Sequence, residues 1–268
     1  MTAGLLSRRE WLAGMTVLAH AAETRAERGA RVVQQALAAL GGDAFLNMRD
    51  RVESGRAYSF YRARLAGLAR MKIYSRYLTR PEPPVAGYFG LRVRQAFGKN
   101  EDVAAVFLED GTGWDINYRG ARPIPAEEGK RFQETQLRNV LYILRMRLGE
   151  PGLIIEGAGR EVVDNQPAEV VEFTDADNRV VTVWFHESTK LPVQQRSFRR
   201  TGGDRSEEVT TLAKYRDVGG GVQWPHTIVR TRDGEKVYEQ FSESVVINQG
   251  LPDNLFLVPA STRILPQK

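Results

Sequence analysis

The chain has three histidines, and only one of them stands in a pattern that resembles a reactive site. His186-Glu187 begins like the zinc motif H-E-x-x-H, but Lys190 occupies the position of the second histidine. The surrounding residues are also typical of a strand end, whereas that motif needs a helix to bring both histidines to one face. His226, which follows Trp224-Pro225, is isolated in the sequence. We therefore interpret both histidines as structural side chains rather than metal ligands.

Carboxylates, hydroxyls and glycine loops form no catalytic pattern in the sequence either. Asp175-Ala176-Asp177-Asn178 is typical of a hairpin turn, where such residues bond the backbone, and it lacks the spacing of a calcium loop. No serine lies in a G-x-S-x-G elbow. Gly111-Thr112-Gly113 and Gly219-Gly220-Gly221 lie between strand-like segments, which predicts tight turns rather than phosphate cradles. The chain has no cysteine, which excludes disulfides and thiolate sites. The sequence thus predicts no catalytic residue, no metal site and no cofactor.

The first 21 residues have the layout of an export signal. Ser7-Arg8-Arg9-Glu10-Trp11-Leu12 places two arginines before a short apolar run, and Ala19-His20-Ala21 offers a peptidase site. The run is about nine residues, whereas a membrane-spanning helix needs roughly twenty. The arginine pair favours the twin-arginine route, which exports folded chains, with the general secretory route as the alternative. We predict cleavage after Ala21 and a soluble protein in the periplasm or otherwise outside the cytoplasm.

The composition is typical of an ordinary globular protein, with 42% hydrophobic and 26% charged residues. The net charge of +5 is a mild basic bias. Its arginines are spread along strand-like segments without interleaved stacking aromatics, which argues against a nucleic-acid partner. No second long apolar segment occurs, so the chain is not expected to span a membrane once the signal is removed. Residues 22–268 show no break in composition and are predicted to form a single domain.

Two segments have the periodicity of helices. The first repeats apolar residues at steps of three and four, from Ala26 to Leu40, and ends at Gly41-Gly42. The second is predicted as one helix from Ala126 to Leu148, followed by the stop signals Gly149 and Pro151. This second helix is apolar over more than half of its circumference, so it must be covered on two sides.

Most of the remaining chain alternates apolar and polar residues in short segments separated by turn signals, which predicts strands. These segments are Arg51 to Arg64, Arg70 to Leu78, Gly90 to Phe97, Val103 to Leu108, Trp114 to Tyr118, Leu153 to Val163, Ala168 to Thr174, Arg179 to His186, Pro192 to Arg199, Glu207 to Asp217, Val222 to Arg232 and Lys236 to Ile247. The short connections allow hairpins but no parallel crossovers, so a long antiparallel meander is expected. About ten or more strands in one sheet would curl. The predicted fold is α+β, a curved sheet forming an incomplete, half-open β-barrel whose concave face is covered by helices.

The carboxyl-terminal half of the chain contains a recognisable series of strand and turn patterns. The first part is Val170-Val171-Glu172-Phe173, a turn, Val181-Thr182-Val183-Trp184-Phe185, and then Ser188-Thr189-Lys190-Leu191-Pro192-Val193. The closing strands add Tyr215-Arg216-Asp217-Val218, Gly221-Val222-Gln223-Trp224-Pro225, Ile228, Val245-Val246-Ile247-Asn248, Leu251, Asn254-Leu255-Phe256 and Val258-Pro259. Together these patterns, over roughly residues 153 to 259, resemble the outer-membrane lipoprotein-sorting proteins of the LolA-like superfamily. The resemblance implies an incomplete antiparallel barrel, plugged by helices, whose apolar interior shelters acyl chains across the periplasm.

Our leading hypothesis is therefore a periplasmic, non-enzymatic carrier or binding protein for lipid or lipoprotein acyl chains, opened by displacement of a helix. Candidate lining residues follow from apolar alternation on the strands and from the apolar face of the second helix. They are Tyr58, Phe60, Met71, Ile73, Phe173, Val183, Phe185, Ile228 and Phe241 from strands, and Leu137, Val140, Leu141 and Leu144 from the helix. A register error of one residue would reverse the face of a whole strand.

Two other functions stay open at this point. The first is a periplasmic sensor or scaffold that binds an envelope protein partner along a sheet edge. An exposed strand edge and an interior filled by side chains would favour it. The second is an extracytoplasmic hydrolase, because two catalytic carboxylates can be distant in the chain. A cleft with two carboxylates would favour the hydrolase, as would a histidine bonded to a carboxylate and a hydroxyl.

Overall fold

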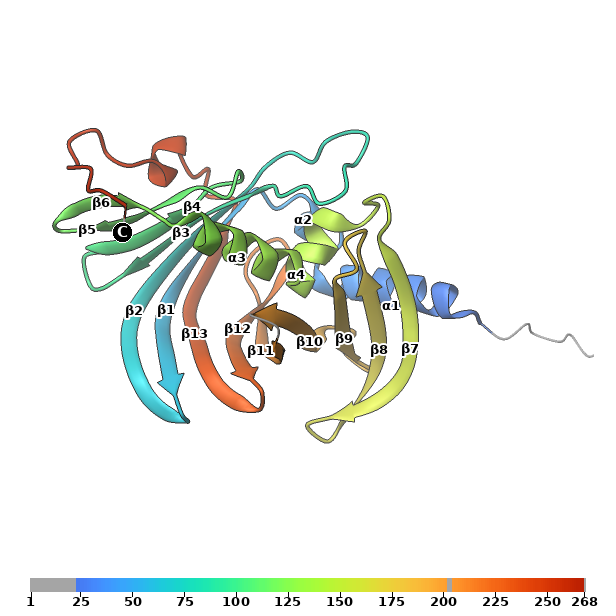
Figure 1. The fold of residues 1–268 in the computed structure, drawn as a ribbon. Coiled ribbons are helices and arrows are strands. Elements are labelled where there is room, and N and C mark those ends of the chain that lie inside the picture. Colours follow the sequence, from blue (N-terminus) through green and yellow to red (C-terminus); the bar gives the residue numbers. More distant parts are fainter. Residues whose placement is uncertain (1–22, 202–203, 268) are drawn as a thin grey trace, which may run out of the picture.

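The computed structural model describes residues 23–201 and 204–267, so the predicted export signal lies outside the described residues. The described chain has an α+β fold with a thirteen-stranded antiparallel sheet that curves without closing (Figure 1). Helices lie against the concave face of this sheet. The predicted fold class is confirmed. None of the described helices is long and apolar enough to cross a membrane.

The strands follow the alternating segments of the sequence closely. They are β1 (Asp50–Tyr61), β2 (Arg64–Tyr77), β3 (Leu91–Phe97), β4 (Val103–Phe107), β5 (Gly113–Asn117), β6 (Gly120–Pro123), β7 (Ile154–Val163), β8 (Gln166–Thr174), β9 (Val180–His186), β10 (Pro192–Thr201), β11 (Asp204–Asp217), β12 (Gln223–Arg232) and β13 (Glu235–Ile247). Strand β2 begins at Arg64 rather than Arg70, because pairing with β1 extends to Tyr61 and Arg64 at the hairpin end. The short strand β6 lies outside the segments predicted from sequence.

The sheet consists of two meanders joined through the first and last strands. Its order is β6-β5-β4-β3-β2-β1-β13-β12-β11-β10-β9-β8-β7. The two meanders are joined by the pairing of β1 with β13, in which Val52, for example, lies opposite Val246. The two outer edges of the sheet, β6 and β7, are consecutive in the chain. The segment that connects them must therefore cross from one edge of the curved sheet to the other.

The helical elements are short apart from the first and the third. They are α1 (Arg25–Leu40), α2 (Asp43–Leu46), α3 (Ala126–Leu137), α4 (Val140–Tyr142), the π-helical turn η2 (Ile143–Arg147) and the 3-10 turn η3 (Asp253–Phe256). Helices α3 and α4, with η2, form the crossing segment between the sheet edges and lie over the concave side of the sheet (Figure 1).

Helix α1 confirms the prediction of an amino-terminal helix. Its first turn is fixed by a capping box between Thr24 and Glu27, and Gly41, at φ 119°, ends it in the left-handed conformation. The helix approaches β7 through Gly29, where a Cβ would lie 2.9 Å from the carbonyl oxygen of Ile155. Only glycine permits this close contact between helix and strand.

The prediction of one continuous helix from Ala126 to Leu148 is wrong. Helix α3 ends at Leu137, and the side chain of Asn139 begins a new segment by accepting a hydrogen bond from the amide of Leu141 at 2.9 Å. Asparagine favours such a cap over a helix interior, because its side chain competes for backbone amides. Beyond α4 the chain widens into the π-helical turn η2 instead of continuing as a regular helix.

An apolar cluster fills the space between the helices and the β7–β12 side of the sheet. It joins α1, α4 and η2 to strands β8 and β9, and its fully buried members include Val32, Leu40, Val140, Leu144, Phe173 and Phe185. A second cluster packs α3 and α4 against β3 and includes Phe89, Leu91, Val93, Leu137 and Tyr142. The helical segment is thus covered on two sides, as its sequence requires.

Candidate functional site

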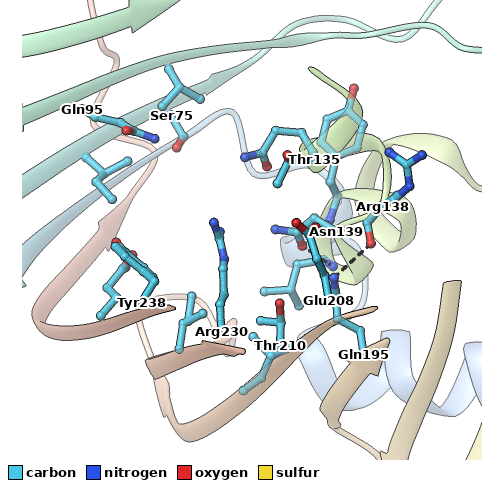
Figure 2. Close-up of a pocket in the computed structure, with 18 of the residues that line it drawn as sticks. Ser75, Gln95, Thr135, Arg138, Asn139, Gln195, Glu208, Thr210, Arg230 and Tyr238 are labelled. Carbon is cyan, nitrogen blue, oxygen red and sulfur yellow. Dashed lines mark hydrogen bonds between the residues drawn. The ribbon is translucent and has the colours of Figure 1, made fainter. Parts of the chain in front are cut away.

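A cavity of about 420 Å³ lies between the concave face of the sheet and the helical segment α3–α4 (Figure 2). Strands β1, β2, β3, β10, β11, β12 and β13 form one wall of this cavity. Part of the lining is apolar and comes from strands and helix together: Ile73, Leu91, Val93, Leu141, Leu212 and Ile228. The volume falls within the roughly 300–1,000 Å³ typical of small-molecule sites.

The central strands place a bonded charge network against the cavity. Arg51 donates from Nε to Glu53 at 2.7 Å and from Nη1 to the Tyr77 hydroxyl at 2.8 Å. Its guanidinium also lies 3.9 Å from the ring centroid of Trp224. Burial by itself lowers the pKa of Arg51, but Tyr77 and Glu53 together raise it above its usual value. The Gln240 side chain donates to the other oxygen of Glu53 at 2.7 Å.

One amide side chain of the sheet bonds the helical wall of the cavity at its break. Gln195 of β10 accepts from the amide of Val140 at 2.8 Å and donates to the carbonyl of Arg138 at 3.1 Å. It therefore pairs both backbone groups that the break between α3 and α4 leaves without helical partners. Asn139 lies at the same break, so the helical wall is fixed where it faces the cavity (Figure 2).

Four arginines, which we name the arginine group, line the cavity near β11: Arg138, Arg199, Arg230 and Arg232. Glu208 of β11 bonds two of them, with Nη2 of Arg199 at 3.3 Å and Nη2 of Arg232 at 3.1 Å. Burial lowers the pKa of Arg138, and the charge of nearby Arg199 acts in the same direction, against the opposing effect of Glu134. Positive charge therefore exceeds negative charge in this part of the cavity.

The cavity holds two carboxylates, but each is engaged in ion pairs. Glu53 bonds Arg51, and Glu208 bonds Arg199 and Arg232. Both carboxylates are thus bound by arginine side chains, unlike the free carboxylate pair on which the hydrolase hypothesis depends. Within residues 23–201 and 204–267, no group of three histidine, aspartate or glutamate side chains could hold a metal ion.

The two described histidines bond neighbouring groups of the fold. Nδ1 of His186 accepts from the amides of Ser188 and Thr189 at 3.2 and 3.1 Å, and Nε2 lies 3.3 Å from Oε1 of Gln166. Nδ1 of His226 lies 2.7 Å from the carbonyl oxygen of Ser242. Neither has the carboxylate and hydroxyl partners that a catalytic histidine would need.

The thirteen residues proposed from sequence to line a cavity fall into several places. Three of them line it: Ile73, Leu141 and Ile228. Leu141 also belongs to the large apolar cluster, together with five residues that do not line the cavity: Val140, Leu144, Phe173, Val183 and Phe185. Leu137 packs in the second cluster with Phe89, Met71 is buried, and Phe60 is partly buried near the hairpin end of β1. Contact of any of these side chains with a ligand stays a prediction.

Two of the proposed residues lie on the other face of the sheet. Gln240 lines the cavity, so its strand neighbour Phe241 points away from it. Ala57 pairs with Gln240, so Tyr58, next to Ala57, also points away. The expected inward placement of Tyr58 and Phe241 is therefore corrected. Inward positions on these central strands carry polar side chains, which the apolar pattern had assigned to the outer face.

Sequence reasoning missed the polar lining for the same reason. Arg51 and Glu53 lie two residues apart on a strand, and so do Arg230 and Arg232. This spacing places each pair on one face. Charged residues on both sides of an apolar one are equally typical of a solvent-exposed face, so this pattern did not mark the face as inward. No sequence signal marks Gln195 either, because its role depends on a helix break elsewhere in the chain.

The fold is similar to that of several solved structures, among them a LolA superfamily protein. An outer membrane lipoprotein-sorting protein domain of Vibrio parahaemolyticus is 15% identical, with a TM-score of 0.58 over 86% of this chain and 97% of that one. A DUF1329 family protein of Desulfovibrio piger is 12% identical, with a TM-score of 0.57 over 86% and 97% of the two chains. A LolA superfamily protein of Nitrosomonas europaea is 13% identical, with a TM-score of 0.50 over 85% and 97%. No protein-family model matches the chain, and no curated protein matches it.

Proposed function

We propose that this chain is a periplasmic, non-enzymatic carrier or binding protein that holds the acyl chain of a lipid or lipoprotein. The observation that carries the proposal is the cavity between sheet and helices, with apolar side chains such as Leu91, Val93 and Ile228 in its wall. Moving an acyl chain from water into such a wall contributes about 0.8 kcal/mol per methylene. The likeness in fold to a lipoprotein-sorting domain supports the same proposal.

Entry of a ligand requires the cavity to open, and α3 is the element we propose to move. Helix α3 buries only Gly129 and Leu137 completely, but its displacement would also separate the ring of Phe132 from that of Phe107, whose centroids lie 4.0 Å apart. The chain breaks between α3 and α4, at Arg138 and Asn139, which offers a hinge next to the well-buried α4.

The proposal is tested by the uptake of an uncharged acyl probe. Ile228→Trp places a bulky ring in the cavity and is expected to weaken binding of a fluorescent long-chain alcohol by about tenfold or more. Val162→Trp, at a side chain that is 71% exposed, is the matched control and should bind as the native chain does. Native mass spectrometry of protein from its own envelope should also show a co-purifying lipid. Absence of both the lipid and probe binding would contradict the proposal.

One observation favours a protein-binding scaffold as the second candidate. Strand β7 is an edge of the sheet, and its side chains Ile154 and Val162 are exposed. An edge strand can accept an added strand from a partner. Lysine or proline substitutions along β7 would abolish crosslinking to an envelope protein if this edge binds one, and would leave acyl-probe uptake unchanged.

A further inference from the structure

Arg230 has an unusual position within the cavity. It rises from β12 into the space between the sheet and the helical segment (Figure 2). Its guanidinium lies 5.3 Å from the ring centroid of Tyr238. Among the described residues it forms no ion pair, whereas its neighbours Arg199 and Arg232 share the carboxylate of Glu208. Arg230 thus presents a half-buried cation to the cavity without a counter-charge.

The strand register places two other members of the arginine group near Arg230. Arg230 pairs with Thr210 on β11, one step along the same face from the pair of Glu208 and Arg232. Arg199 reaches the same carboxylate from β10. Arg138 lies on the helical wall with its guanidinium directed away from Arg230 (Figure 2), and the carboxylate of Glu134 lies 3.6 Å from it.

The balance of positive and negative side chains favours an anion in this part of the cavity. Arg51 is balanced by Glu53 at the central strands, so it adds no free charge. The arginine group has Glu208 as a carboxylate on the sheet and Glu134 beside Arg138 on the helix. Two cations are left over, and partly desolvated guanidinium groups without partners are costly to hold together. An anionic group placed among them would remove that cost.

We infer that the ligand of the cavity is an amphiphile whose head group is a phosphate or a carboxylate bound by Arg230, with Arg199 beside it. The inference rests on the proposed function and adds the chemical class of the ligand. A guanidinium binds the two oxygens of such a group with paired, charge-assisted hydrogen bonds. The apolar tail then lies toward β2 and β3, along Ile73, Leu91 and Val93.

The test compares two probes that differ only in charge. The native chain is expected to bind a fluorescent long-chain fatty acid about tenfold or more tightly than the matching alcohol, since charge-assisted bonds exceed neutral ones. Arg230→Gln should reduce acid binding to the level of the alcohol, and Arg230→Lys should retain part of the preference. Arg70→Gln, at an exposed side chain of β2 outside the cavity, is the control and should keep the full preference. Circular dichroism of each variant confirms folding.

The outcomes separate this inference from the function on which it rests. Equal binding of acid and alcohol, or an unchanged preference in Arg230→Gln, overturns the head-group assignment and leaves the acyl-binding proposal standing. Calorimetry with inorganic phosphate distinguishes a free anion from a lipid head group. If phosphate binds in an Arg230-dependent manner while neither acyl probe binds, the amphiphile is overturned, and the proposed function fails with it.

Discussion

The buried guanidinium of Arg147 bonds two carboxylates and one backbone carbonyl of the same chain. Its guanidinium bonds Glu150 at 2.7 and 2.8 Å, Asp175 at 2.9 Å and the carbonyl of Leu137 at 2.7 Å. The π-helical turn η2 places the residue inward, beside the end of β8. Because both carboxylates are buried with it, loss of the arginine would leave Glu150 without an ion pair and Asp175 with Arg179 as its remaining charged partner.

We therefore predict that Arg147→Met lowers the free energy of unfolding by about 3 to 5 kcal/mol, the cost of breaking a buried ion pair from one side. Arg160→Met removes an ion pair with Glu187 whose arginine is 70% exposed, and should cost less than about 1 kcal/mol. Urea denaturation followed by circular dichroism measures both. Equal losses in the two variants would show that the buried network contributes no more than a surface pair.

The stability that this network contributes depends on pH, because Asp175 titrates in acid. Burial by itself raises the pKa of this carboxyl group, but the amide of Arg179 and the guanidinium of Arg147 lower it below its usual 3.8. A carboxyl group with a lowered pKa in the folded state stabilises the fold above its unfolded pKa. That stabilisation is lost as the pH falls through the folded pKa.

The expected outcome is a free energy of unfolding that declines as the pH drops below about 4, with part of the decline due to Asp175. Asp175→Asn should be less stable than the native chain at pH 7 and should show a shallower decline in acid. Urea midpoints measured from pH 7 to pH 3 check this. Parallel curves for the two proteins would assign the acid sensitivity to other carboxyl groups, such as Glu109, whose pKa is lowered by Arg92.

At the scale of elements, the break between α3 and α4 depends on a side chain from the sheet. Gln195→Leu would leave the amide of Val140 and the carbonyl of Arg138 without partners. We expect a loss of about 1 to 3 kcal/mol in the free energy of unfolding. We also expect faster hydrogen exchange in α3 than in α1, because the end of α3 would lose its bonds to Gln195 and keep only the bond from Arg199 to the Thr135 hydroxyl as its hydrogen-bonded link to β10. Gln194→Leu, on the opposite face of the same strand, is the matched control. Unchanged exchange in α3 would show that Gln195 does not hold this helix.

The sequence predicted the strands well because alternation and turn residues are local signals. The same signals could not reveal that β1 pairs with β13, because that contact joins distant parts of the chain. The helix break was missed because Asn139 lies within a run of apolar residues that continues the helical period. Its cap is recognisable only once Gln195 is seen beside it.

The cavity was harder to predict than the fold. Apolar alternation assumes that the inward face of a strand is apolar, which holds for Val183 and Phe185 in β9. On the central strands the inward positions include Arg51, Gln240 and Arg230. Polar side chains at these positions are compatible with the interior because they bond one another or face the cavity. A sequence pattern alone does not distinguish such a lining from a solvent-exposed face.

At the scale of the whole molecule, the path of the chain ties the two meanders into one unit. Their junction, β1 with β13, lies in the middle of the sheet, and separating the halves would leave both central strands with an unpaired edge. The apolar clusters also bridge the halves. Phe45 and Met48, which precede β1, pack with residues of β8 and β9, and Tyr77 of β2 contacts both main clusters.

This arrangement predicts that the two meanders unfold together, as expected for a single domain. Hydrogen exchange should give the same opening free energy for the slowest amides of β2, in the first meander, and of β9, in the second. Calorimetry should show one transition, and a bound acyl ligand should raise its midpoint as a whole, because a ligand of the folded state stabilises every element that unfolds with its site. The 3-10 turn η3, outside the sheet, provides an internal control that opens at lower free energy. A stable β9 beside a β2 that opens several kcal/mol more easily would instead divide the chain into two units, with the cavity lying across their boundary.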